Sequence, residues 1–460
     1  MYLSDTICAI ATATAPSGIG IIRVSGPEAI ALCDSIFKAK SRHSLLEAKA
    51  YTMHYGFIYD QDQVIDEVLV SVFRAPHSYT AEDSVEINCH GGPFVLQKVL
   101  HLLTEKGVRI ASPGEFTRRA FLNGRLDLSE AEAVMDTISA QNAFALDASM
   151  KQLRGELSRL IASMRADILY EIAFIESALD DPEHISLDGY PEKLSDKCKT
   201  LLSQTEKLIL SYESGKIRKE GIYTVILGKP NAGKSSLLNY LLGENRAIVT
   251  DIAGTTRDVL EEDILLDGMQ LHLVDTAGIR SSQDKIEQIG VEKALTYAKK
   301  ADLILYLVDG SAPITEEDRQ IADLIRDKKV IVLQNKTDLV QSVQREDILS
   351  LLPNAGCILP ISALNGEGVD ALANTVKEMF YHGDLTMNDQ IYLTNVRHKQ
   401  LMEQARQSLL QVQHSLEQNM PEDFLSIDLM DAYKALGFII GEEIDDDLAE
   451  EIFSKFCMGK

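Results

Sequence analysis

The chain has 460 residues, too many for one ordinary hydrophobic core, and its length suggests about three domains. Its content is 45% hydrophobic and 25% charged, it contains no long uninterrupted apolar run, and residues 1–5 carry no basic segment. We therefore expect neither membrane insertion nor export, and predict a cytoplasmic protein. The net charge of −25 disfavours long-range attraction to nucleic acid, so an RNA partner would need a local basic patch or a second protein.

Residues 1–120 mix short β-rich runs with a few helical patterns, which predicts an α+β domain. The runs 7–13 and 19–24 flank Pro16-Ser17-Gly18, a turn-forming triplet, and indicate two strands joined by a turn. Further elements are expected along the same domain: strands at 68–73 and 84–89 and a helix at 93–103.

From Ser129 onward the apolar period becomes helical. Ser129 and Glu132 have the spacing of a capping box, which predicts a helix N-terminus at Ser129. Apolar residues then recur at helical intervals over 153–179, and Asp180-Asp181-Pro182 is expected to end that helix. Further helices are expected at 191–213, 397–418, 423–436 and 446–456, with Lys216–Lys219 leading into the next strand.

Between these helical stretches, strands and helices alternate in the rhythm of a parallel doubly wound sheet. The simplest architecture is one all-α domain made from residues 121–220 and 381–460, with a Ras-like α/β P-loop domain, residues 221–380, inserted at a surface loop. Two independent helical domains are the alternative.

The motif G-x-x-x-x-G-K-[ST] occupies residues 228–235, after an apolar run and before a helical pattern. That order of strand, loop and helix is the context that a P-loop requires. The backbone N–H groups of such a loop surround phosphate oxygens, Lys234 places a charge on the β and γ phosphates, and the Ser235 hydroxyl can reach Mg²⁺. The nucleotide-binding residues expected here are Asn231, Ala232, Gly233, Lys234, Ser235 and Ser236.

Further motifs stand at strand ends. In Asp275-Thr276-Ala277-Gly278 a carboxylate can hold Mg²⁺ through water, and the glycine N–H can sense the γ-phosphate. In Asn335-Lys336-Thr337-Asp338 the last carboxylate can accept two hydrogen bonds from guanine, whereas adenine would leave it unpaired. Ser362-Ala363-Leu364 fits the last base-contacting loop. Together these motifs predict a GTPase.

The segment Asp251-Ile252-Ala253-Gly254-Thr255-Thr256-Arg257-Asp258 supplies the switch, with Thr256 as a second hydroxyl on Mg²⁺. The order of motifs resembles translation-factor-like GTPases. Where Ras-like enzymes carry a glutamine that orients water, this chain has Ile279, so hydrolysis must be assisted from elsewhere.

A more specific resemblance is carried by residues 228–236, 251–258, 113–128 and 456–460. Through them the chain resembles the MnmE/TrmE family of tRNA-modification GTPases from end to end. It departs at Met458, where the family usually has isoleucine. Cys457 beside it has no visible base in the sequence, so we assign it no catalytic role.

The resemblance implies a homodimeric, potassium-activated GTPase that works with the flavoprotein MnmG (GidA) in a heterotetramer. The pair would attach an aminomethyl or carboxymethylaminomethyl group to C5 of the wobble uridine of certain tRNAs. The one-carbon donor would be a reduced folate, 5-formyl- or 5,10-methylene-tetrahydrofolate. The resemblance assigns potassium to Asn231, Thr250, Ile252 and Thr255, and orientation of the attacking water to Glu287.

The N-terminal domain is similar to folate-dependent one-carbon domains. Matching positions assign Arg23, Glu86 and Arg125 to the folate, with Lys460 reaching toward it. A carboxylate suits the N–H edge of a pterin, and arginines suit its carbonyl or the glutamate tail. Two other functions stay open: a regulatory GTPase switch in ribosome assembly, and a folate aminomethyltransferase that carries a GTPase but turns over without GTP.

Overall fold

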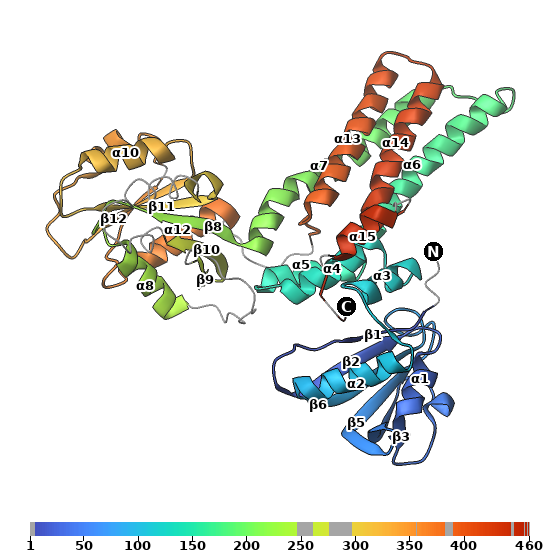
Figure 1. Cartoon of the computed structure of the whole chain (residues 1–460). Coiled ribbons are helices and arrows are strands. Elements are labelled where there is room, and N and C mark those ends of the chain that lie inside the picture. The colour runs from blue at the N-terminus through green and yellow to red at the C-terminus, as the bar shows by residue number, and fades with distance from the viewer. Residues whose placement is uncertain are drawn as a thin grey trace. The chain divides into compact units, whose positions relative to one another are not determined.

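The computed structural model describes residues 5–245, 261–275, 297–355, 357–381, 390–442, 446–454, 456, 457 and 459 (Figure 1). The chain divides into two compact units, one of residues 1–139, 149–205 and 400–460, and the other of residues 140–148 and 206–399. The α+β, all-α and α/β parts of the predicted fold class are all present. The domain boundaries expected near residues 120, 220 and 380 stay predictions.

The N-terminal part is a seven-stranded sheet of order β3-β4-β5-β6-β2-β1-β7. Alternate residues of β2, β5 and β6, such as Val24, Val72 and Ile87, are buried in one core with Leu96 and Val99 of α2. This period-two burial is why these runs form strands with one face against helices. The bounds are β1 (Ile7–Ile10), β2 (Ser17–Ser25), α1 (Ala29–Ile36), β3 (Phe37–Ala39), η1 (Leu45–Glu47), β4 (Thr52–Asp60), β5 (Gln63–Phe73), β6 (Ser84–Gly91), α2 (Pro93–Glu105) and β7 (Arg109–Ile110).

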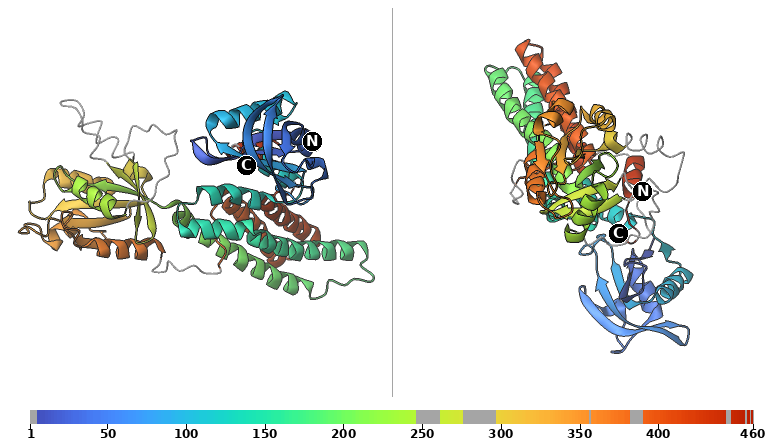
Figure 2. Two further views of the ribbon diagram at one scale, coloured as in Figure 1. Left: turned by 90° about the horizontal axis from the view of Figure 1, so that it is seen from below. Right: turned by 90° about the vertical axis from the view of Figure 1, so that its left-hand side faces the viewer.

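The helical elements are α3 (Glu115–Leu122), α4 (Leu128–Ser139), α5 (Ala143–Leu153), α6 (Glu156–Asp180), α7 (Tyr190–Glu220), α13 (Val396–Glu417), α14 (Glu422–Ile440) and α15 (Asp446–Ser454). Helix α6 buries Leu157, Ile161, Met164 and Ile168, a helical stripe, and lies beside α14 (Figure 1, Figure 2). It ends at Asp180, as predicted.

Helix ends differ from the sequence-based expectation most clearly at the start of α4 and at the end of α7. The capping box is formed by Asp127 and Glu130: Glu130 N donates to Asp127 Oδ1 at 2.8 Å, and Asp127 N donates to Glu130 Oε2 at 2.9 Å. The prediction of Ser129 as the cap was therefore wrong, because α4 already begins at Leu128 and Asp127 accepts the hydrogen bond from the first turn. Helix α7 continues to Glu220, so Lys216–Lys219 are helical, and Gly221 follows with φ +85°.

The α/β part has the sheet order β13-β12-β11-β8-β10-β9, parallel except for β9 against β10. Its elements are β8 (Ile222–Leu227), α8 (Lys234–Asn245), β9 (Glu261–Leu266), β10 (Met269–Asp275), β11 (Leu303–Asp309), α10 (Glu316–Ile325), β12 (Val330–Asn335), α11 (Arg345–Leu351), β13 (Cys357–Pro360) and α12 (Val369–Tyr381). After β8 the chain adds β9 and β10 on one side of this strand, and then adds β11, β12 and β13 on the other side. The loop after β8 therefore lies at a topological switch point, where ligands bind in such folds.

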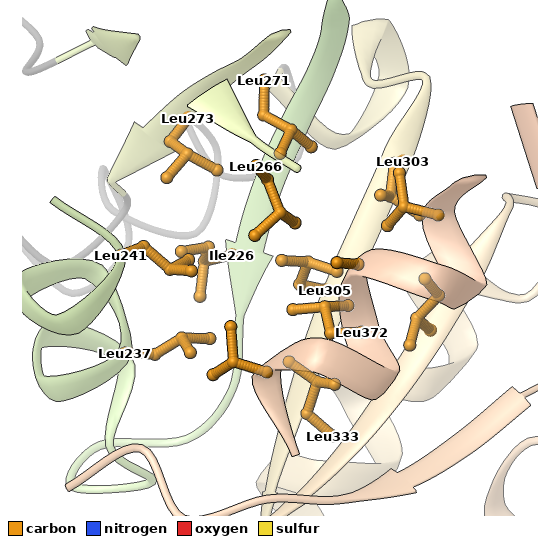
Figure 3. Packing of buried hydrophobic residues seen from close by; sticks show 14 of the residues in the cluster. Ile226, Leu237, Leu241, Leu266, Leu271, Leu273, Leu303, Leu305, Leu333 and Leu372 are labelled. Atoms are coloured by element: carbon orange, nitrogen blue, oxygen red, sulfur yellow. The ribbon is translucent and has the colours of Figure 1, made fainter. Parts of the chain in front are cut away.

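Both faces of this sheet are covered. Leu303 and Leu305 of β11 enter a core with α8 and α12 (Figure 3), to which Leu307 also belongs. Ile304 and Tyr306 enter a second core with α10 and α11. Burial on both faces explains the uninterrupted apolar run of this strand. Within the described ranges, no helix is long and apolar enough to cross a membrane.

Candidate functional site

A glycine-rich loop connects the end of β8 to the start of α8. Gly228, Asn231 and Gly233 have φ values of +156°, +63° and +102°. A Cβ on Gly228 would lie 2.6 Å from the backbone oxygen of Leu307, and a Cβ on Gly233 would collide with the side-chain amide of Asn335. Close approach of neighbouring chain segments therefore requires glycine at both positions.

Lys234 is the first residue of α8 and lies over this loop. Its Nζ donates to the backbone oxygens of Gly228 at 2.7 Å and Lys229 at 2.9 Å. Ser235 and Ser236 are exposed at the same helix end, where backbone N–H groups and the helix dipole favour an anion. The cation, hydroxyls and amide donors that a Mg²⁺-bound triphosphate needs thus gather at one place.

Asn335, at the end of β12, joins this loop to the predicted base-binding loop. It is buried, its Nδ2 donates to Ala232 O at 2.7 Å, and its Oδ1 accepts from Ala363 N at 2.9 Å. The structure therefore brings together three motifs that lie far apart in the sequence.

The predicted base-reading carboxylate belongs to Asp338, which is exposed. Ser362 Oγ donates to its Oδ1 at 2.8 Å, and Thr337 N donates to Ile361 O at 3.2 Å, so the two loops are tied together. Among the described residues, Asp338 Oδ2 receives no hydrogen bond. Leu364 is 75% exposed beside this loop. This arrangement fits an acceptor held ready for the N–H edge of guanine.

Sequence reasoning missed two charged contacts of this site. Lys336 Nζ donates to Asp309 Oδ2 at 2.6 Å. Burial disfavours the Asp309 carboxylate, but hydrogen bonds from Lys336 and Ser311 outweigh burial and hold its pKa below the ordinary value. The sequence signal that could have identified Asp309 is its position at the end of β11, a buried apolar strand. The second contact pairs Lys229 of the phosphate loop with the buried Asp318.

Other predicted nucleotide-site residues lie outside the described residues. They are Thr250, Asp251, Ile252, Ala253, Gly254, Thr255, Thr256, Thr276, Ala277, Gly278 and Glu287. Strand β10 ends at Asp275. Lys460, expected at the second site, also lies outside the described part. Their roles stay predictions.

The second group of predicted residues lies on the N-terminal sheet. Arg23 of β2 is directly opposite Glu86 of β6 in an antiparallel pair. Arg23 Nε and Nη2 lie 2.9 Å and 2.8 Å from Glu86 Oε1. The side chains are only 14% and 25% exposed, so this charge-assisted pair is screened by solvent less than a surface ion pair.

Tyr79 contacts two guanidinium groups of this site. Its ring centroid is 5.1 Å from Cζ of Arg23 and 4.9 Å from Cζ of Arg125, within the range of cation–π attraction. Arg23 Nη1 also donates to Gly459 O at 3.1 Å. A Cβ on Gly459 would lie 2.6 Å from the backbone oxygen of Ile10. Arg23, Glu86 and Arg125 thus meet around Tyr79, beside Gly459, and Tyr79 is a member that no sequence spacing indicated.

A buried ion network supports this site. Arg119, 1% exposed, lies 2.7 Å from Asp5 Oδ1, 3.2 Å from Glu82 Oε1 and 3.1 Å from Glu115 Oε1. Burial disfavours the Glu115 carboxylate, but hydrogen bonds from Arg109, the Ser112 backbone and Arg119 outweigh it, so the pKa of Glu115 lies below its ordinary value. The network fixes α3, which precedes Arg125.

A doubly wound sheet with a glycine loop at its switch point, tied through Asn335 to the predicted base-binding loop, is typical of a P-loop domain of the GTPase class. Residues 128–457 match the family described as the MnmE helical domain, and residues 6–125 match the family described as GTP-binding protein TrmE N-terminus. The chain belongs to the MnmE family of tRNA modification GTPases.

Two relatives show how far the similarity extends. A protein of Lachnoclostridium phytofermentans named tRNA modification GTPase MnmE is 54% identical over 458 residues, which are 99% of this chain and 100% of the relative. A protein of the same name from Clostridioides difficile is 46% identical over 460 residues and covers 100% of both chains. Among solved structures, Era of Aquifex aeolicus bound to GDP and AlF4⁻ is 31% identical, with a TM-score of 0.28, over 41% of this chain and 67% of Era.

Proposed function

We propose that this chain is a potassium-activated GTPase that, with the flavoprotein MnmG, adds an aminomethyl or carboxymethylaminomethyl group to C5 of the wobble uridine of certain tRNAs, with a reduced folate as the one-carbon donor. The observation that carries the proposal is the second site, where Arg23, Glu86, Tyr79 and Arg125 gather beside Gly459. A GTPase that acted only as a binding switch would not need this cluster.

The nucleotide site fits GTP. The loop and Lys234 hold the phosphates, Asp338 reads guanine, and Ser235 supplies a hydroxyl to Mg²⁺, with Thr256 as the proposed second hydroxyl. A potassium ion held by Asn231 would supply positive charge against the phosphates, the part that an arginine finger has in other GTPases. The proposed remaining potassium ligands are Thr250, Ile252 and Thr255.

Glu287 is proposed to orient the attacking water. Ile279 stands where Ras-like enzymes carry the glutamine that does this, and an isoleucine side chain has no hydrogen-bonding atom for water. A carboxylate can accept a hydrogen bond from that water and so align its oxygen with the γ-phosphate.

The second site fits a reduced folate. Arg23 engages only Oε1 of Glu86, and among the described residues Oε2 receives no hydrogen bond, so it can accept from the N–H edge of a pterin. Tyr79 offers a flat surface, and Arg125 offers a cation to a carbonyl or to the glutamate tail. Lys460 is proposed to reach the same ligand. When bound, the folate would supply the one-carbon unit.

Hydrolysis can be coupled to the helices through β10. Gln270 of this strand is buried, and Asn142, just before α5, donates from Nδ2 to Gln270 Oε1 at 3.3 Å and to Arg218 O at 3.1 Å. Because β10 ends at Asp275, at the start of the proposed γ-phosphate sensor, a shift of the strand would act on the start of α5 and on the end of α7.

The remaining parts of the proposal are a cytoplasmic homodimer that assembles with MnmG into a heterotetramer and acts on tRNA. Because the chain carries a net charge of −25, we assign much of the attraction for tRNA to the partner or to local cationic residues.

Two measurements test this function. Calorimetry with 5-formyltetrahydrofolate should detect binding without GTP, and Glu86→Ala should weaken it by about 10-fold or more because a charge-assisted acceptor is lost. In a reconstituted modification assay with the flavoprotein, GTP should support product formation and a non-hydrolysable analogue should not. Undetectable folate binding would remove the one-carbon part, and full modification with the analogue would remove the role of hydrolysis.

A further inference from the structure

The second residue of the phosphate loop, Lys229, is buried although lysine side chains usually extend into solvent. Its Nζ lies 3.1 Å from Asp318 Oδ2 and 3.2 Å from Pro313 O, and the exposed fractions of the two charged side chains are 10% and 0%. Asp318 Oδ2 also accepts from Thr315 N at 2.8 Å, and Tyr306 OH donates to Asp318 O at 3.2 Å. The lysine therefore enters a fixed polar socket at the start of α10.

A buried ion pair is poor evidence for stability as such, because apolar residues of the same volume often fold as well or better. The pair therefore calls for another explanation. Its position supplies one, because Lys234 donates to the backbone oxygens of Gly228 and of Lys229 itself. Where the loop carbonyls lie determines where the ammonium of Lys234 lies.

We propose that Lys229 is a positioning residue for GTP binding and hydrolysis: its ion pair with Asp318 holds the carbonyl oxygens on which the phosphate-binding Lys234 rests. Two contacts then fix the start of the loop against β11 and α10. One is the close backbone approach of Gly228 to Leu307, and the other is the side-chain pair. The inference rests on the proposed assignment of this loop to the phosphates.

The test measures GDP affinity and dissociation with Mg²⁺, together with kcat and KM for GTP. Lys229→Met keeps the length of the side chain but removes its charge, and should weaken GDP binding by about 10- to 100-fold, the range known for groups that orient metal-binding side chains. Lys229→Arg should recover most of the affinity. Lys377→Met is the matched control, because Lys377 pairs with Asp267 at 3.9 Å, and both of these side chains are more exposed than the pair in the socket.

A double variant, Lys229→Met with Asp318→Asn, addresses folding because it leaves no unpaired buried charge. Both substitutions break the same ion pair, so their effects should not add. The double variant should therefore bind GDP no more weakly than whichever of Lys229→Met and Asp318→Asn binds it more weakly alone. The melting temperature without nucleotide, measured for every variant, separates positioning from stability: a positioning role predicts that the double variant keeps the wild-type melting temperature but not the wild-type affinity.

Wild-type GDP affinity in Lys229→Met or in the double variant would overturn the inference, as would a loss of affinity that follows melting temperature alone. A wild-type chain that binds no GDP would instead overturn the proposed function, so the two failures are distinguishable.

Discussion

Exchanging the base-reading carboxylate for an amide should change nucleotide preference from guanine to xanthine. Asp338→Asn keeps the size of the side chain and keeps Oδ1 beside the Ser362 hydroxyl, which lies 2.8 Å from it. The second carboxylate oxygen becomes an NH2 group, which opposes the N–H donors of guanine but can donate to the 2-oxo group of xanthine.

The size of the effect follows from the bond that is lost. A hydrogen bond to a charged group contributes about 1.5–3 kcal/mol, which corresponds to about 10- to 100-fold in affinity. We expect GDP binding to weaken by that factor and XDP binding to strengthen correspondingly. Ser362→Ala removes only the neutral hydroxyl that orients Asp338, so this variant should lose less GDP affinity, about 2- to 10-fold.

Titration of fluorescent GDP and XDP derivatives measures both preferences. Asp267→Asn is the control, since Asp267 is an exposed aspartate of the same compact unit and lies on the turn before β10. If Asp338→Asn bound GDP as tightly as the wild type while XDP binding stayed weak, the loop at Asp338 would not read the base.

GTP turnover in potassium should exceed that in sodium by about 10²- to 10³-fold, which is the scale of one contact that stabilises charge in the transition state. Asn231→Ala should abolish the difference, and equal rates in the two salts would refute the role of the cation. Glu287→Ala should leave nucleotide affinity nearly intact but slow single-turnover hydrolysis by about 10²- to 10⁴-fold, whereas a parallel loss of binding would indicate a structural role. The pKa of Glu115 is lower in the folded state than in the unfolded state, so the ionised carboxylate stabilises the fold at pH values above the ordinary carboxyl pKa. That stabilisation is lost as the pH falls from about 4.3, the ordinary value, toward the lowered pKa. In urea titrations, the free energy of unfolding of Glu115→Gln should therefore fall less steeply at acid pH than that of the wild type. An unchanged pH dependence would contradict this role of Glu115.

The sequence predicted where the glycine loop after β8 and the loop after β12 lie, because these features depend on backbone conformation and on where strands end. Gly233 is required by a φ of +102°, and Asn335 follows an apolar run that can only be a buried strand. The register of the sheet then brings these residues together without further information. The same holds for Arg23 and Glu86, which lie opposite each other on paired strands, although the motif resemblance was needed to select them.

Features that depend on tertiary proximity could not be predicted. The partner of Lys229 lies 89 residues away in the sequence, and nothing in the spacing marks Asp318 as a socket. Tyr79 is ordinary in its local sequence and becomes part of a site only through its contacts with two arginines that lie far from it in the sequence. The cap at Asp127 was missed because Ser129, two residues later, has an equally good local pattern.

The most direct test of the central claim is mass analysis of the wobble uridine in tRNA from cells that lack this protein, with and without the wild-type gene restored. The account predicts that the C5 aminomethyl-type modifications disappear in its absence and return with the wild type, but not with Glu86→Ala or Glu287→Ala. Normal wobble uridine modification in cells lacking the protein would contradict the account and favour a GTPase switch in ribosome assembly.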